Sequence, residues 1–315
     1  MPAEFAIPEI VRRRALNLGE VGRDWLAGLD ADIASLASEW GIQLGAVLDG
    51  GTEAFVAEAT TSEGRSAILK IGIPGSASGR TEARVLEVAA GRGYAELFRH
   101  DAPRRAMLLE RLGPRLADLG LTVDDQIKAI CETLLTAWRP PPADSSFING
   151  AEKAESLATF IADLWVSLEG PCSRAVVDRA RIFAERRRSA YSFATSVLAH
   201  GDAHENNTLL VADSVPQAFK FIDPGGLVIE PAYDLAISMR GWSRSFMDGD
   251  ALTLGHERAE QLAALTGVPP QPIWEWGLIE RVSTGLLLKQ LGQEAWATEV
   301  LAVAEIWATD TSGQG

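Results

Sequence analysis

The polar residues best suited to chemistry are concentrated in one short stretch, "LAHGDAHENNTLL" from Leu198 to Leu210. In it, Asp202 is followed after four intervening residues by Asn207, and Asp223 comes later in "FKFIDPGG", after a short apolar strand pattern. Carboxylate and amide oxygens are hard ligands that suit Mg²⁺, which completes its shell with water and substrate phosphates. These oxygen ligands therefore indicate phosphoryl transfer from a nucleotide.

Phosphoryl transfer also needs a cation that holds the nucleotide phosphates, and the first third of the chain offers one. Lys70 lies inside the apolar strand pattern "SAILKIGI", and a lysine in such a strand needs a partner. Glu82 opens the following helix pattern and is the expected partner. Glu87 is the rival, but its five-residue shift places it on a different helical face. Without the other motifs, a solvent-facing lysine on an edge strand is equally consistent with the pattern.

The spacing D-x-x-x-x-N, with a later aspartate after a strand, is that of the protein-kinase catalytic loop and its metal aspartate. "HGDAHENN" followed by "FIDPGGLVIEPAYDLA" resembles the aminoglycoside phosphotransferases, and most closely their streptomycin 6-kinase and hydroxyurea-resistance kinase branch. The resemblance extends through most of the chain and is weakest before Leu44 and after Arg240. It implies a protein-kinase-like fold, with ATP and Mg²⁺ as cofactors.

The resemblance also assigns roles at matching positions. It makes Asp202 the catalytic base, Asn207 and Asp223 the magnesium ligands, and His200 the residue that braces the catalytic loop. Asp234 in "YDLA" matches an aspartate that we expect to support this loop.

The remaining loop residues are less constrained by the pattern. Asn206 competes with Asn207, and only the four-residue spacing selects Asn207. His204 also occurs in the streptomycin-kinase branch, where it would position the loop; otherwise it is a hydrogen-bonded structural residue. Glu205 is a candidate contact to the substrate.

Two further segments are expected to bind the nucleotide. "DGGTEAF" places Gly50 and Gly51 between two strands, where bare backbone N–H groups could approach ATP phosphates. The pattern alone equally fits an ordinary hairpin, but the resembling branch has a similarly short loop with a hydroxyl residue where Thr52 stands. "LLERLG" is the expected hinge, in which backbone groups around Glu110 and Leu112 would contact adenine.

The elements that must position these residues change in type along the chain. Residues 45–73 read as three short strands separated by turns, 80–93 as a helix with a glycine end, and 104–113 as another strand. Long amphipathic helices are then predicted over 122–138, 156–168, 174–198, 255–267 and 274–308. We therefore predict an α+β, bilobal, protein-kinase-like fold with a small antiparallel sheet in the N-lobe. Its parts are a nucleotide-binding lobe at 1–109, a hinge at 110–113, and a helical C-lobe with the catalytic loop and substrate site at 114–315.

Composition limits the class of partner. The 315 residues carry a formal charge of −14 and a sequence pI near 4.8, which repels nucleic acid and favours cationic small molecules or simple solubility. No apolar run has the roughly 18 residues of a membrane span, and the N-terminal segment lacks the apolar core of a signal peptide, so we expect a cytoplasmic protein. Cys131 and Cys172 fit neither a disulfide framework nor a thiolate zinc site.

A cationic acceptor would need carboxylates near Asp202, and two later segments, "SFMDGD" and "WEWGLIER", contain acidic residues interleaved with tryptophans. The acidic candidates are Asp248, Asp250, Glu275 and Glu280, and the tryptophans are Trp242, Trp274 and Trp276. The same residues are also consistent with solvated loops and with core positions on amphipathic helices.

The leading hypothesis is an ATP-dependent kinase that phosphorylates a hydroxyl of a small cationic antibiotic of the streptomycin type and so confers resistance. Within the fold, the alternative is a kinase of another small molecule, such as an amino sugar, a peptide antibiotic, hydroxyurea or a choline-like alcohol. A metal-dependent hydrolase built on His200, Asp202, His204 and Asp223 would leave Lys70 unexplained. A catalytically silent ATP-fold binding module is disfavoured because no catalytic position is lost. The oligomeric state stays open.

Overall fold

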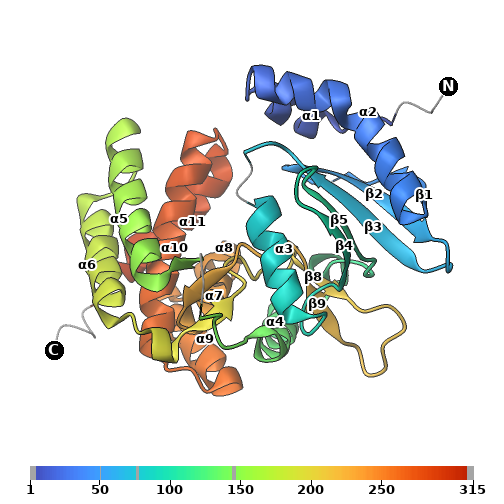
Figure 1. Cartoon of the computed structure of the whole chain (residues 1–315). Coiled ribbons are helices and arrows are strands. Elements are labelled where there is room, and N and C mark those ends of the chain that lie inside the picture. The colour runs from blue at the N-terminus through green and yellow to red at the C-terminus, as the bar shows by residue number, and fades with distance from the viewer. Residues whose placement is uncertain (1–4, 50, 76–77, 144–146, 311–315) are drawn as a thin grey trace. The chain divides into compact units, whose positions relative to one another are not determined.

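The computed structural model describes residues 5–49, 51–75, 78–143 and 147–310 (Figure 1). Its contacts divide the chain into two compact units: the first comprises 1–114 and 209–225, and the second 115–208 and 226–315. The first unit contains 110–114, which the prediction divides between the hinge and the helical lobe, and it also contains 209–225, which the prediction assigns to the helical lobe. This segment groups with the first unit because its strands bind there; for example, the Gly113 N–H donates to the Leu210 carbonyl at 2.7 Å.

The first unit is built on an antiparallel five-stranded sheet with the order β1-β2-β3-β5-β4. Its strands are β1 (Ile42–Val47), β2 (Ala54–Thr61), β3 (Ser66–Gly72), β4 (Leu97–Asp101) and β5 (Ala106–Glu110). Strands β1, β2, β3 and β5 lie where strands are predicted, within or next to 45–73 and 104–113. Strand β4, "LFRHD", is not among the predicted strands, because this edge strand is nowhere fully buried and shows no clear apolar alternation.

Helices cover both faces of this sheet. On one face lie α1 (Glu9–Leu16) and α2 (Glu20–Trp40), and α2 buries Trp25, Leu29, Ile33 and Leu36 at helical spacing against the sheet. Leu69 and Ile71 of β3 point into this core, so the alternation of a strand turns Lys70 to the other face. There it meets Glu82 of α3 (Ser78–Ala89), which therefore lies on the face opposite α2, as Figure 1 shows.

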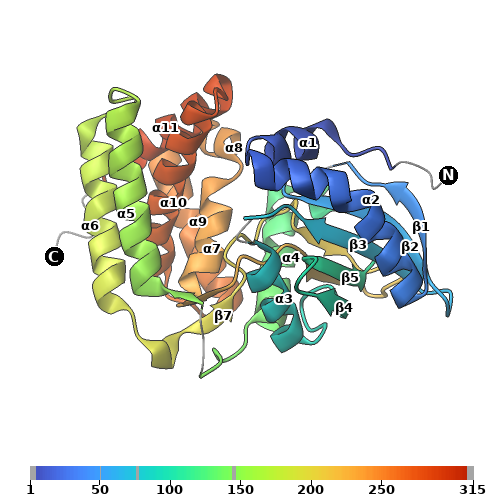
Figure 2. The same cartoon turned by 45° about the horizontal axis from the view of Figure 1, so that its top comes forward.

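The second unit is mainly helical (Figure 2). Its α-helices are α4 (Val123–Ala137), α5 (Gly150–Ser167), α6 (Arg174–Ala190), α7 (Ala232–Arg240), α8 (Ser243–Met247), α9 (Ala251–Thr266), α10 (Pro270–Gln290) and α11 (Glu294–Trp307). Helix α10 is central, because it packs against α5, α6, α7, α9 and α11 and buries residues on all sides. A helix that is apolar all round is expected in such a position.

Two predicted helices differ from the structure, and the one predicted over 274–308 is interrupted at 291–293 between α10 and α11. The other is predicted over 174–198, but α6 ends at Ala190 and a short 3-10 turn, Phe193–Thr195, precedes strand β7 (Val197–Ala199). Strand β7 pairs with β10 (Leu227–Ile229), which in turn pairs with β6 (Ile148–Asn149). These backbone partners are distant in sequence, and they override the helical pattern. The result is a short strand that leads directly into the polar loop.

Among the described helices, none combines the length and apolar character needed to cross a membrane. Cys131 is a buried free thiol and Cys172 a partly buried free thiol. Burial raises the pKa of Cys131 to about 12 and that of Cys172 to about 11, so both are protonated at neutral pH.

Candidate active site

One buried carboxylate holds the start of the polar loop that follows β7. Asp234, in the first turn of α7, is fully buried and accepts the backbone N–H groups of His200 at 2.9 Å and Gly201 at 2.7 Å. It also accepts the indole N–H of Trp138 at 2.9 Å. The carboxylate thereby gives a partner to two backbone N–H groups and one indole N–H that would otherwise be buried without one. The loop therefore has a fixed starting point.

Asp202 is fixed from both sides by its neighbours in the loop. His200 is fully buried, and its Nδ1 accepts the Asp202 N–H at 3.1 Å. The Asn207 side-chain amide donates to the Asp202 carbonyl at 3.1 Å. This bond uses the amide nitrogen of Asn207, so that its oxygen is suited to act as a ligand for a hard cation.

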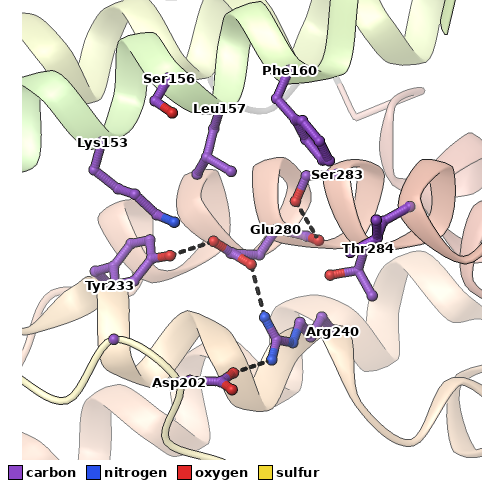
Figure 3. Close-up of a pocket in the computed structure, with 12 residues that line it drawn as sticks. Lys153, Ser156, Leu157, Phe160, Asp202, Tyr233, Arg240, Glu280, Ser283 and Thr284 are labelled. Atoms are coloured by element: carbon purple, nitrogen blue, oxygen red, sulfur yellow. Dashed lines mark hydrogen bonds and ion pairs between the residues drawn. The ribbon is translucent and has the colours of Figure 1, made fainter. Parts of the chain in front are cut away.

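The Asp202 side chain lies between two cationic or potentially cationic groups. Arg240 donates to its Oδ1 (Figure 3), and His204 Nε2 lies 3.4 Å from its Oδ2. Burial alone would raise the pKa of Asp202, but the hydrogen bond from His204 and the charge of Arg240 lower it well below the ordinary 3.8. The carboxylate is therefore ionised at neutral pH and can accept a hydrogen bond from a substrate hydroxyl.

Arg240 joins Asp202 to a second carboxylate, that of Glu280 on α10. Its Nη1 lies 2.9 Å from Glu280 Oε2, and Tyr233 donates its phenol proton to Glu280 Oε1. Arg240 and Tyr233 are not among the predicted site residues. Their spacing of seven residues, two turns of one helix, was the available signal that both point the same way.

Asp202 opens into a pocket of about 380 Å³ within the second unit. Helices α5, α7 and α10 contribute its walls, as Figure 3 shows. Besides Asp202, the charged side chains that line it are Lys153, Arg240 and Glu280. A pocket that meets an ionised, positioned carboxylate is a suitable place for the acceptor of a phosphoryl group.

Of the acidic residues expected to hold a cationic acceptor, only Glu280 lines this pocket. Glu275 is 2% exposed and forms ion pairs with Arg187 at 2.6 Å and Arg186 at 3.4 Å. Asp250 caps α9 by accepting the Leu252 N–H at 3.2 Å.

The other candidates for acceptor binding also lie outside the pocket lining. Asp248 lies in an exposed position after α8, and Glu205 accepts the side-chain amide of Asn206 at 3.2 Å. Trp274 and Trp276 are buried core residues, and Trp242 lies 5.7 Å from the Arg258 guanidinium.

In the first unit, Lys70 meets two carboxylates. Its Nζ lies 2.7 Å from both oxygens of Glu82 and 2.6 Å from Asp223 Oδ1. Burial would lower the pKa of Lys70, but the two negative charges raise it above its ordinary value, so the ammonium is retained. Glu87 instead lies beside Arg84 at 3.5 Å and His100 at 3.7 Å, so the structure pairs Lys70 with Glu82.

Strand β9 (Phe219–Phe221) delivers Asp223. It pairs with β8 (Thr208–Leu210), and its Phe221 exchanges backbone hydrogen bonds of 2.9 Å with Gly93 and Ala95. Asp223 has a left-handed backbone (φ 57°), which Asp tolerates better than most residues, and its side chain is half exposed. A carboxylate beside a fixed ammonium, with part of its surface open, is suited to act as a Mg²⁺ ligand.

The expected nucleotide turn is described only in part, since Gly50 lies outside the described residues. A Cβ on Gly51 would lie 3.1 Å from both the Ala54 carbonyl and a methyl of Val56, so a larger residue would be crowded there. Thr52 is exposed.

At the expected hinge, the Glu110 side chain accepts the Glu96 N–H at 2.9 Å and pairs with Lys220 at 2.6 Å. Its own N–H donates to the Glu96 carbonyl at 2.8 Å. Leu112 is half-buried.

The histidines of the hydrolase alternative are engaged in the loop itself. His204 Nδ1 accepts the Asn206 N–H at 3.1 Å, as His200 Nδ1 accepts that of Asp202. Within the described ranges, no three His, Cys, Asp or Glu side chains form a group that could hold a metal ion.

A family model described as aminoglycoside/hydroxyurea antibiotic resistance kinase matches residues 40–292. Streptomycin 6-kinase of Streptomyces griseus is 28% identical over 293 residues, 92% of each chain. Hydroxyurea phosphotransferase of Kitasatospora aureofaciens is 24% identical over 302 residues, 95% of this chain and 84% of that protein.

Solved structures resemble the chain over most of its length. A macrolide 2'-phosphotransferase type I has a TM-score of 0.57 at 19% identity and covers 89% of this chain and 97% of its own. Aminoglycoside phosphotransferase APH(4)-Ia, in a ternary complex with AMP-PNP and hygromycin B, has a TM-score of 0.60 at 16% identity and covers 89% and 98%. These similarities confirm the predicted α+β, protein-kinase-like fold.

Proposed function

Because this chain belongs to the family of aminoglycoside/hydroxyurea antibiotic resistance kinases, and so is a phosphotransferase that acts on hydroxyl groups, we propose that it transfers the γ-phosphoryl group of ATP to a hydroxyl of a streptomycin-like antibiotic. The observation that carries the proposal is the ionised Asp202 carboxylate, fixed in its loop and open to a pocket of about 380 Å³. Inactivation of the antibiotic would confer resistance in the cytoplasm, where ATP is available.

The first unit would bind the nucleotide. Lys70, held as an ammonium by Glu82, would contact ATP phosphates, and the backbone of Gly51 and the hydroxyl of Thr52 would lie against them. The hinge around Leu112 would contact adenine. These roles follow the resemblance position by position.

The resemblance makes Asp223 and Asn207 the proposed metal ligands. When bound, Mg²⁺ would neutralise charge on the β- and γ-phosphates. The chain's own contribution is to present a half-exposed carboxylate on β9 and an amide oxygen on the loop. Lys70 would keep Asp223 oriented through its 2.6 Å contact.

Asp202 would orient the accepting hydroxyl. The bond from the acceptor oxygen to the γ-phosphorus forms as the bond from that phosphorus to the β–γ bridging oxygen breaks, and ADP leaves. The hydroxyl proton passes to the Asp202 carboxylate and then to solvent. Since the transition state of phosphoryl transfer is loose, a carboxylate of low pKa serves mainly by positioning the hydroxyl.

Mass spectrometry of reaction mixtures tests the proposal. The purified protein is incubated with ATP, Mg²⁺ and one acceptor at a time: streptomycin, another aminoglycoside, a peptide antibiotic, hydroxyurea, an amino sugar or choline. We expect the mass of one phosphoryl group to be added to streptomycin or a close analogue. Phosphorylation of choline or the amino sugar alone would support kinase activity and rule out an antibiotic as the acceptor. Protection of a sensitive host by the expressed chain tests the resistance role.

A further inference from the structure

Arg281, on α10, carries a fully buried guanidinium in the core of the second unit. The group lies between two aromatic rings, 5.0 Å from the centre of Phe246 and 4.6 Å from that of Trp307. Burial, with the neighbouring charge of Arg258, lowers the pKa of Arg281 well below its ordinary value. A buried cation is costly unless its hydrogen bonds offset the loss of water, so its acceptors indicate what it does there.

The acceptors of Arg281 lie at the end of α7, on both sides of Arg240. Its Nη2 donates to the Met239 carbonyl and, at 3.3 Å, to the Gly241 carbonyl. The last carbonyls of an α-helix have no partner within the helix, and a cation at that end also interacts favourably with the helix dipole. Arg240 is the last residue of α7. One side chain therefore fixes the backbone immediately before and after it.

The turn that follows α7 depends on the same guanidinium. Trp242 has a left-handed backbone (φ 47°), which is unfavourable for a bulky residue. Arg281 donates to the Gly241 carbonyl before it and, at 2.9 Å, to the Ser243 hydroxyl after it. A backbone conformation of this kind persists only where its surroundings hold it. The two bonds from Arg281 supply that restraint.

Helix α10 thus holds Arg240 in two ways. Glu280 binds the Arg240 guanidinium, which Figure 3 shows reaching on to Asp202. Arg281, the next residue of α10, binds the flanking backbone. Gly277, one turn earlier on the same face as Arg281, lets the two helices approach, since a Cβ there would lie 2.7 Å from the side chain of α7 that it faces.

We propose, on the basis of the phosphotransfer proposed above, that Arg281 is a positioning residue, which fixes the last turn of α7 and so directs the guanidinium of Arg240 to Asp202. Arg281 does not itself line the pocket beside Asp202. It acts on the reaction only through Arg240.

A double-mutant cycle tests whether Arg281 acts through Arg240. With streptomycin as acceptor, kcat and the KM for ATP are measured for the full-length protein, Arg281→Met, Arg240→Met and the double variant. Arg281→Lys is made as well, because it keeps a cation in the core and extends the test if Arg281→Met does not fold. Arg258→Met is the matched control, since it also removes a cation beside Phe246, at 3.9 Å from the ring centre, but Arg258 donates to Ser245 rather than to α7.

We expect Arg281→Met to lower kcat by about tenfold, because a misplaced Arg240 no longer fixes Asp202, and to leave the KM for ATP unchanged. The double variant should be no slower than Arg240→Met, since the two residues act in series. Arg281→Lys should show a smaller loss of kcat, and Arg258→Met none. Losses that multiply in the double variant would overturn the proposal, and so would an equal loss of kcat in Arg258→Met.

The order of the Arg240 side chain gives a readout that needs no turnover. The ¹⁵N relaxation of its Nε–H group, assigned by the loss of that signal in Arg240→Met, reports how firmly the guanidinium is held. Arg281→Met and Arg281→Lys should lower its order parameter, and Arg258→Met should leave it unchanged. This difference without phosphorylation of any acceptor would reject the phosphotransfer and uphold the positioning of Arg240 by Arg281. An Arg240 side chain that is equally ordered in every Arg281 variant that folds would overturn the proposal.

Discussion

Arg240→Met is the substitution from which most can be learned at the candidate site, because one guanidinium contacts both Asp202 and Glu280. We expect turnover to fall by about 10–10²-fold, since Asp202 loses the group that fixes its side chain. The pKa of Asp202 should rise as well, because a positive charge that lowers it is removed. The acid limb of kcat/KM should therefore move to higher pH.

The loss of stability follows from the burial of the two partners. Glu280 is 4% exposed, and a buried carboxylate that loses its cation costs about 3–5 kcal/mol. Tyr233 continues to donate to it, which favours the lower value of about 3 kcal/mol. Asp202 is 43% exposed, so its half of the contact adds less than about 1 kcal/mol. At roughly 2–4 °C per kcal/mol, the melting temperature should fall by about 6–16 °C.

The depressed pKa also fixes the pH dependence of this contribution. A carboxyl whose folded-state pKa lies below the ordinary 3.8 stabilises the fold above that pH, and the contribution is lost as pH falls through the folded-state value. The stability difference between the protein and Arg240→Met should therefore be full at pH 7, and the part due to Asp202 should shrink in strong acid.

The double variant Arg240→Met/Glu280→Gln separates stability from catalysis. It removes the buried charge and leaves an amide oxygen that can accept from Tyr233. Calorimetry should therefore show that at least half of the decrease in melting temperature caused by Arg240→Met is recovered. Turnover should stay low, since Asp202 is still without its guanidinium. Arg240→Lys should retain part of the activity. Recovery of turnover in the double variant would refute the positioning role, and a melting temperature no higher than that of Arg240→Met would refute the buried-charge argument.

The remaining predictions concern single residues. Asp202→Asn should lose about 10²–10⁴-fold in turnover while binding a fluorescent ATP analogue normally, and a retained rate would remove Asp202 from the mechanism. Lys70→Ala should raise the KM for ATP and lower the melting temperature, because Glu82, 1% exposed, would lose its cation; an unchanged melting curve would contradict this. Asp223→Asn should raise the Mg²⁺ concentration needed for half-maximal rate, and an unchanged requirement would place the metal elsewhere. Glu275→Gln should lower the melting temperature and leave the acceptor KM unchanged, because Glu275 is paired with Arg187. A raised acceptor KM would indicate that Glu275 contacts the acceptor.

Local sequence spacing was sufficient to predict most of the sheet in the first unit, the polar loop and the Lys70–Glu82 pair. The strand alternation and the interval from Asp202 to Asn207 each lie within a few residues, and the Lys70–Glu82 pair spans twelve. The error over 191–198 has a different origin. Strand β7 exists because β10 lies beside it, and no window of sequence contains that partner.

The pocket beside Asp202 could be predicted only in part for the same reason. Lys153, Arg240 and Glu280 come from three helices, and the packing of α10 against α5 and α7 brings them together. Residue type alone could not separate Glu280, which lines the pocket, from Glu275, which is paired with Arg187. The two lie five residues apart on α10 and therefore on different faces of the helix.

The central claim is the transfer of a phosphoryl group from ATP to an acceptor hydroxyl at Asp202, and ATP labelled with ¹⁸O at the three non-bridging γ-oxygens tests it most directly. Mass spectrometry of the acceptor should show one added phosphoryl group that carries all three labelled atoms, formed in step with ADP, and Asp202→Asn should form it at least about 10²-fold more slowly. Labelled inorganic phosphate as the sole product, with every acceptor unmodified, would contradict the account.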